Sequence, residues 1–326
     1  TTGSQNFTDD VTLTADTTLT SSGNGAITLG GTVDGAQALT VNTGGTTTFG
    51  DIIDIASLAT DAGGTTAING GIVTTSAGQD YGDNVTLGDA TTLVSSGGDT
   101  IALGGTVTGA QALTVITTGT TRFDGSVSIA SLATDVGGTT QINGGSVTTT
   151  GAQTYNDAIS LGDAATLSGT DGTFQALAGN GNDLTLAFTG AIDIAGDFTD
   201  LNDLVASGAS IAFAGQTLSG TGSATLTSSG VVGDGTIAFD GDVSVSGSNV
   251  ALTSVSSTNG DVSLNAAADL IVTALAAGDD ASLTAGGNLT LNNPAEVVDD
   301  LALTADDFFG VALTGPFAAT FGDDLT

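Results

Sequence analysis

The side chains that could do chemistry in this sequence are almost all aspartates. Near the C-terminal end, one motif recurs in which an Asp precedes a short run of alternating apolar and small polar residues. These aspartates follow one another at a nearly constant spacing: Asp242, Asp261, Asp280 and Asp300. Carboxylate oxygens are the ligands that Ca²⁺ prefers. If these residues stack, they predict a calcium-binding column.

Stacked aspartates would repel one another. Side chains on adjacent parallel strands lie roughly 4.8 Å apart, and two like charges at that distance repel by about 1 kcal/mol even in water. The chain has a net charge of −34 and one basic residue, Arg122, so no lysine can offset the column. We therefore expect Ca²⁺ to compensate it. The alternative is that the carboxylates splay into solvent among loosely bound Na⁺.

Other residue types exclude whole classes of function. The sequence has no His and no Cys, which removes imidazole bases, catalytic triads and zinc thiolates. Binding to nucleic acid phosphates needs Lys and Arg, and the acidic charge also disfavours anionic membranes. Paired carboxylates could act on sugars, but a single Arg is a poor basis for binding acidic ones. We predict that the chain is not an enzyme and that Arg122 is a surface residue facing Asp124.

The elements that would position the aspartates are short strands. Apolar residues alternate with Thr or Ser, which is the period of a strand, and Gly and Asp between these runs indicate turns. Glu296 is the only glutamate, and this preference for Asp is typical of turn chemistry. Residues 197–206 are the best helical candidate, and a poor one. Two strand-like segments recur together with each aspartate of the column, and such a pair describes one turn of a β-helix.

A longer repeat covers the N-terminal half. Residues 27–93 recur without a gap as residues 101–167, and most paired positions are identical. Internal repetition of this kind is typical of solenoids. We interpret the 74-residue period as four turns, which predicts that equivalent residues are buried on the same side. Three such pairs are Leu39 and Leu113, Val41 and Val115, and Ile68 and Ile142.

These observations predict an all-β, right-handed parallel β-helix (β-solenoid) with about 17 turns of about 19 residues each. We expect one continuous array in three parts. Residues 1–170 hold two copies and a part copy of the 74-residue block, residues 171–240 a degenerate solenoid, and residues 241–326 the regular 19–20-residue turns. No apolar run approaches the roughly 18 residues that a membrane-spanning helix needs.

The motifs also resemble a known group of proteins. The recurring strands Gly241–Val245 and Gly260–Leu264 resemble the β-helices of filamentous-haemagglutinin-like bacterial surface proteins. The segment Ala152–Gly162 is similar to repeats of very large bacterial β-strand-repeat proteins. The resemblance implies a structural segment of an extracellular or cell-surface fibre. The alternative is an adhesin stalk or binding module for a host, cell or glycan surface.

Partners follow from the same interpretation. Both ends of the sequence fall within a repeat, so we expect Thr1 and Thr326 to continue into further β-helix, in the same chain or in another copy, end to end. Exposed aromatic residues would favour the binding module instead. The dense aromatic group is Phe308, Phe309, Phe317 and Phe321, which could equally fill the core or form an interface.

Overall fold

The fold is built from parallel strands that stack turn upon turn. A computed structural model describes residues 1–310 and 317–325. These residues form a β-solenoid of about 15 turns of about 20 residues, with no helix among them. The predicted all-β parallel β-helix is therefore confirmed. The expected 17 turns were too many, because several turns near the N-terminus are longer than predicted: Gln5 pairs with Ile27, and Gln79 with Ile101. The weak helical candidate at residues 197–206 lies in strand β27, Phe198–Gly208.

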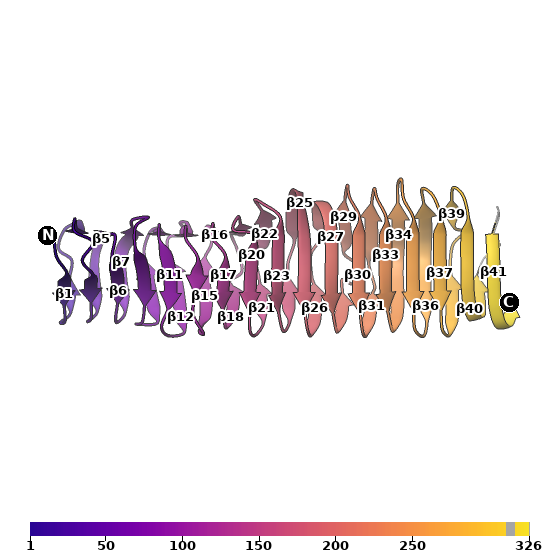
Figure 1. Ribbon diagram of the computed structural model, residues 1–326, viewed down its shortest axis with the longest axis horizontal. Coiled ribbons are helices and arrows are strands. Elements are labelled where there is room, and N and C mark those ends of the chain that lie inside the picture. The colour runs from indigo at the N-terminus through magenta and orange to yellow at the C-terminus, as the bar shows by residue number, and fades with distance from the viewer. Residues whose placement is uncertain (311–316, 326) are drawn as a thin grey trace. The chain divides into compact units, whose positions relative to one another are not determined.

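The chain divides into two compact units, residues 1–165 and 166–326. Figure 1 shows the successive turns of each unit side by side. The strands that begin in unit 1 are β1 Gln5–Phe7, β2 Val11–Thr12, β3 Thr17–Ser21, β4 Ile27–Leu29, β5 Val33–Thr43, β6 Thr46–Phe49, β7 Ile53–Thr60, β8 Thr65–Ile68, β9 Ile72–Thr75, β10 Gln79–Tyr81, β11 Asn84–Leu87, β12 Thr91–Ser95, β13 Ile101–Leu103, β14 Val107–Thr108, β15 Ala112–Thr117, β16 Thr120–Phe123, β17 Val127–Ile129, β18 Ser131–Thr134, β19 Thr139–Ile142, β20 Ser146–Thr149, β21 Gln153–Tyr155, β22 Ala158–Leu161 and β23 Ala165–Gly169.

Unit 2 contains most of the long strands, although β5 of unit 1 also has 11 residues. Its strands are β24 Gly172–Phe174, β25 Leu177–Phe188, β26 Ala191–Ile194, β27 Phe198–Gly208, β28 Ser210–Ala212, β29 Thr217–Gly220, β30 Ala224–Ser228, β31 Val231–Gly233, β32 Thr236–Phe239, β33 Val243–Gly247, β34 Asn249–Ser257, β35 Val262–Ala266, β36 Leu270–Ala277, β37 Ala281–Ala285, β38 Asn288–Leu291, β39 Glu296–Val297, β40 Leu301–Gly310 and β41 Phe317–Leu325.

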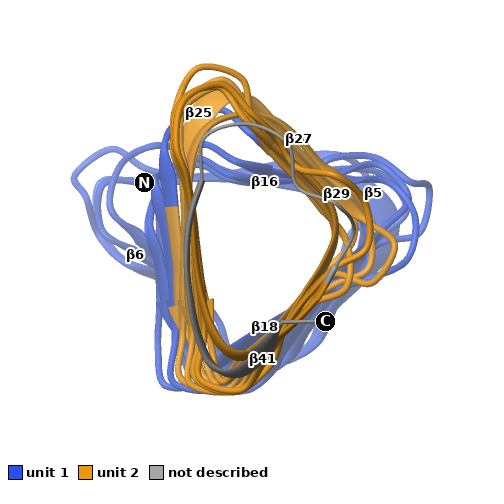
Figure 2. Cartoon of the chain, turned by 90° about the vertical axis from the view of Figure 1, so that its right-hand side faces the viewer, with its two compact units in different colours: residues 1–165 blue, residues 166–326 orange. Residues whose placement is uncertain are grey.

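Each unit winds around a three-sided core. Viewed end-on, the strands of each unit lie along three sides that meet at corners (Figure 2). Along a side, alternate residues point inward, and the inward residues of successive turns stack. Val33, Ile53 and Val73 form one such stack and are 0–1% exposed. Aliphatic stacks of this kind bury apolar surface in every turn, which is the main stabilising contribution to the fold.

The interpretation of the 74-residue repeat as four turns is wrong. Leu39 pairs with Leu58, Leu58 with Gln79, and Gln79 with Ile101. Ile101 therefore lies in the same stack as Leu39, three turns further along. Leu113 lies two sides further along the next turn, on β15. One block therefore spans three and two-thirds turns, and its copies are rotated by one side about the unit axis. The expectation of four turns took the short, constant spacing of unit 2 as general, whereas the turns of unit 1 differ in length and several are longer.

Equivalent residues of the two copies are buried in spite of this rotation, because the three sides offer similar environments. The predicted pairs are all buried, with exposures of 0–1%: Leu39 and Leu113, Val41 and Val115, and Ile68 and Ile142. A residue and its equivalent in the next copy thus share the core but not the same side of it.

The short period of unit 2 is confirmed. Val243 pairs with Val262, Val262 with Ala281, and Ala281 with Leu301, so each turn has nearly the same length. The companion segments β34, β36 and β38 also stack on one another in register. These pairings position the aspartates that precede each strand.

Candidate functional site

The four predicted aspartates form a column in unit 2. Each stands directly before a strand, and β33, β35, β37 and β40 are paired in register. The side chains of Asp242, Asp261, Asp280 and Asp300 are all exposed to solvent. The sequence therefore located the column correctly.

The column is held together by hydrogen bonds that the sequence did not reveal. The backbone N–H of Asp261 donates to Oδ1 of Asp242, at 3.0 Å. The N–H groups of Asp280 and Asp300 donate in the same way to Asp261 and Asp280, also at 3.0 Å. Each of the first three carboxylates thus accepts a backbone proton from the next turn. Such a charge-assisted bond offsets part of the repulsion along the column.

These contacts depend on side-chain length more than on charge. On the companion strands, Oδ1 of Asn249 accepts the N–H of Asp269, and Oδ1 of Asp269 accepts the N–H of Asn288. An amide oxygen and a carboxylate oxygen therefore accept the same kind of backbone hydrogen bond from the next turn. A side chain with one methylene group spans one inter-strand step of roughly 4.8 Å, which gives a physical reason for the near absence of glutamate. The hydrogen bond reaches the backbone of the next coil of the solenoid. The turn chemistry predicted from the sequence would instead have kept it within one short connection between strands.

Two further aspartates lie beside this column. One carboxylate oxygen from each of Asp279, Asp280 and Asp299 lies within 4.8 Å of the others, and all three residues are exposed. Loss of solvent contact and the charges of Asp280, Asp261, Asp299 and Asp242 raise the pKa of the Asp279 carboxyl. Because Asp279 is exposed, we regard the neighbouring charges as the dominant cause. The acidic corner, as we call Asp279, Asp280 and Asp299, is the most crowded part of the column.

The acidic corner offers part of a calcium coordination shell. Ca²⁺ takes six to eight oxygen ligands, and three carboxylates can provide three or more of them, with water supplying the rest. Of the predicted ligand set, the corner includes Asp280 and leaves out Asp242, Asp261 and Asp300. Exposed carboxylates also gather where no metal binds, and the backbone hydrogen bonds give the aspartates of this column a structural role of their own. Calcium therefore stays a prediction.

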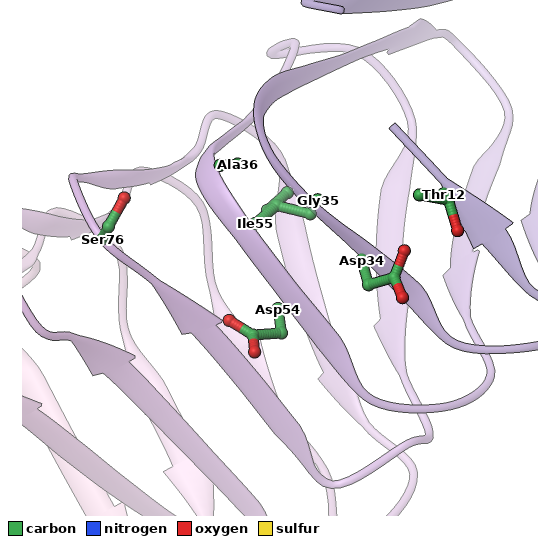
Figure 3. Close-up of a pocket in the computed structure, with 7 residues that line it drawn as sticks. All are labelled: Thr12, Asp34, Gly35, Ala36, Asp54, Ile55 and Ser76. Atoms are coloured by element: carbon green, nitrogen blue, oxygen red, sulfur yellow. The ribbon is translucent and has the colours of Figure 1, made fainter. Parts of the chain in front are cut away.

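A second pair of carboxylates borders a shallow groove in unit 1. Asp34 of β5 and Asp54 of β7 are paired on adjacent turns, and both are exposed. With the other side chains in Figure 3 they line a groove of about 440 Å³: Thr12, Asp34, Gly35, Ala36, Asp54, Ile55 and Ser76. This lining contains no basic side chain. The second repeat copy has Thr108 and Ser128 at the equivalent positions, so the pair is not a repeated feature.

The remaining predicted residues are placed as follows. Arg122 Nε donates to Oδ2 of Asp124 at 2.8 Å, which confirms the predicted pairing. In the aromatic group, Phe308 is buried and Phe309 is 47% exposed. Phe317 and Phe321 belong to β41, but their side chains lie outside the described residues, as does Thr326. The group is therefore not shown to be an exposed cluster.

Comparison of the chain with protein families, with curated proteins and with solved structures finds no match. The resemblance to filamentous-haemagglutinin-like proteins accordingly rests on the sequence motifs. No helix among the described residues has the length and apolar character needed to cross a membrane.

Proposed function

We propose that this chain is a structural segment of an extracellular or cell-surface fibre, and that its turns stack end to end with turns of the same chain or of another copy. The observation that carries the proposal is the stacking itself: within each unit the parallel turns pair in register, and each turn contacts only its neighbours. In the first turn of unit 1, strands β1, β2 and β3 pair with β4 and β5 of the next turn. Among the described residues no strand pairs with their other edge, where Thr1 bonds to the backbone of Thr20 and Ser22 at the end of β3. Unpaired edges of this kind recruit further strands.

The core of this first turn is apolar and incompletely filled. A cavity of about 230 Å³ lies there, lined by Phe7, Val11, Thr12, Leu13, Thr14, Ala15, Thr17, Leu19, Leu29, Val33 and Leu39. Phe7, Val11 and Leu19 are partly exposed, whereas their counterparts in later turns are buried. A further turn stacked on this face would cover these side chains and satisfy the free backbone groups of the edge.

In this proposal the chain has a mechanical role, as a structural element of the fibre. Within each unit, backbone hydrogen bonds join every turn to the next, and stacked Val, Leu and Ile fill the interior. The net charge of −34 opposes side-by-side association of the fibres and keeps them in solution. Because the sequence has no Cys, its stability comes from repetition and not from disulfides.

The test is concentration-dependent assembly. We expect sedimentation velocity and electron microscopy to show end-to-end filaments of the intact chain at high protein concentration. Leu19→Asp places a charge in the apolar face and should prevent assembly. Thr18→Asp adds the same charge to a neighbouring exposed position and should not. A monodisperse monomer at high concentration would contradict the fibre and favour the binding module.

One observation favours the alternative, an adhesin stalk or glycan-binding module. Ile52 and Ile72 precede the paired residues Ile53 and Val73 on adjacent turns, and they are 43% and 41% exposed. The second repeat copy has Ser126 and Ser146 instead. If this spot binds a surface or a glycan, replacing both isoleucines with serine should abolish binding to a glycan array while leaving the fold intact.

A further inference from the structure

Two aspartates lie inside the solenoid of unit 1. Asp83 is 3% exposed and Asp157 is 4% exposed, and they occupy equivalent positions in the two repeat copies. Each stands at a corner: Asp83 lies between β10 and β11, and Asp157 between β21 and β22. Because the copies are rotated by one side, the two residues occupy different corners of the unit.

Asp83 joins two sides and two turns of the structure. Thr60 Oγ1 and Thr66 Oγ1 donate hydrogen bonds to its Oδ1, at 3.1 and 2.7 Å. Thr60 ends β7 and Thr66 lies in β8, and these strands are the neighbours of β10 and β11 in the preceding turn. The carboxyl therefore closes the interior of the corner.

Asp157 repeats this arrangement with its own pair of threonines. Its Oδ1 accepts hydrogen bonds from Thr134 Oγ1 at 2.7 Å and from Thr140 Oγ1 at 2.9 Å. Thr140 Oγ1 also lies 2.8 Å from Oδ2. The same geometry at two places shows that a buried carboxyl with two hydroxyl donors is a recurring part of the repeat.

No positive charge compensates these carboxyls. The charge of Asp61 acts on Asp83 and the charge of Asp135 on Asp157, and the charge of Asp157 acts in turn on the Tyr155 hydroxyl. The one basic side chain, Arg122, is paired with Asp124. Burial raises the pKa of both carboxyls above the usual 3.8, and the neighbouring aspartates add to the rise, whereas the threonine hydrogen bonds work against it. Burial is the largest of these effects.

We propose that Asp83 and Asp157 make unit 1 responsive to protons: protonation of the two carboxyls stabilises the unit, and their ionisation toward neutral pH weakens it. The hydrogen bonds favour the ionised form, but burial outweighs them, and a protonated carboxyl can still accept both hydroxyl protons at its carbonyl oxygen. What protonation removes is the cost of an uncompensated charge in the interior.

The direction follows from the two states of the chain. In the unfolded chain both carboxyls titrate near 3.8, whereas in the folded chain they hold their protons to higher pH. The folded state binds more protons within this window, so the stability of unit 1 falls as pH rises through it. Above the folded-state pKa the loss is complete and stability levels off. Each pKa unit of the shift changes the unfolding equilibrium constant about tenfold per carboxyl.

The experiment is urea denaturation of the whole chain from pH 3.5 to pH 8 at fixed ionic strength, a range that starts just below the usual carboxyl pKa of 3.8 and so covers any rise above it. Near-ultraviolet circular dichroism follows the two tyrosines of the sequence, Tyr81 and Tyr155. Both are fully buried and stand two residues before the aspartates, so they report on the corners concerned. We expect the wild-type midpoint to fall as pH rises. Asn keeps the acceptor oxygen, so Asp83→Asn with Asp157→Asn should remove most of this fall and raise the midpoint at pH 8.

The matched control is Asp89→Asn with Asp163→Asn. These residues are also equivalent in the two copies and are exposed, and the variant changes the net charge by the same amount. It should keep the wild-type pH dependence. Equal pH profiles for the two double variants would overturn the proposal, because the response would then come from total charge. If the buried variant does not fold, carboxyl ¹³C NMR of the wild type decides: two resonances besides that of Asp279 should titrate above the rest, and their absence would overturn the proposal as well.

Discussion

The buried tyrosines give the sharpest test of how the core is held together. Tyr81 is fully buried, and its hydroxyl donates to Oε1 of Gln79 at 2.9 Å. The Gln79 amide in turn donates to the carbonyls of Val73 at 3.1 Å and Val94 at 2.9 Å, on adjacent turns of another side. The tyrosine thereby completes a polar bridge across the apolar interior.

Replacing Tyr81 with Phe keeps the ring and removes one donor. Oε1 of Gln79 would then be buried without that proton, and leaving such an acceptor unsatisfied costs about 1–3 kcal/mol. Tyr155 makes the equivalent bond to Gln153 at 3.0 Å, so Tyr155→Phe should cost a similar amount. Burial raises the pKa of both hydroxyls far above the usual 10.0, so they stay protonated and the loss should not change between pH 5 and pH 8.

The assay is urea denaturation followed by far-ultraviolet circular dichroism. The two sites are three and two-thirds turns apart, about 18 Å at the inter-strand spacing, so the double variant should lose the sum of the two single losses. A loss under about 0.5 kcal/mol for either variant would refute the bridge as a stabilising element. A loss that grows or shrinks with pH would refute the assignment of protonated hydroxyls.

Four further predictions concern the column and the repeat. Asp280→Ala should lower stability by about 1 kcal/mol, because the Asp300 N–H loses its acceptor, whereas Asp280→Asn should be nearly neutral in urea denaturation. Asp279→Asn should raise the melting temperature at low salt by removing a repelled charge, and the gain should vanish in 1 M NaCl. If Ca²⁺ binds the column, millimolar Ca²⁺ should raise the melting temperature more than NaCl of equal ionic strength, and chelator should reverse the gain. Deleting residues 27–100, one full block, should leave a folded protein with an unchanged strand signature in circular dichroism, since Ile101 then occupies the place of Ile27.

Much of the fold could be predicted because a solenoid turns sequence spacing directly into spatial neighbours. The step along the sequence from Val243 to Val262 and on to Ala281 is also the step between paired strands. The number of sides per turn could not be obtained in this way. All three sides carry alternating apolar residues, so the 74-residue repeat fits four short turns as well as three and two-thirds longer ones.

The candidate site was predictable to the same extent. The column of Asp242, Asp261 and Asp280 was visible because it repeats with the turn. Asp279 and Asp299 were missed because Gly260 stands at the corresponding place one turn earlier and interrupts their spacing. Asp83 and Asp157 were missed because an aspartate after a strand resembles any surface turn. The signal that could have found them is their position two residues after the tyrosines of both copies.

The fractional turn of the repeat bears on how such a chain could lengthen. A tandem duplication need not preserve whole turns, because the two copies of this block both fold although they differ by one side in their place around the axis. Each added copy would also present its outward side chains one face further round than the copy before, so three copies would bring one feature to all three faces. As the chain lengthens by added copies, its outward side chains would thus be distributed evenly around the axis.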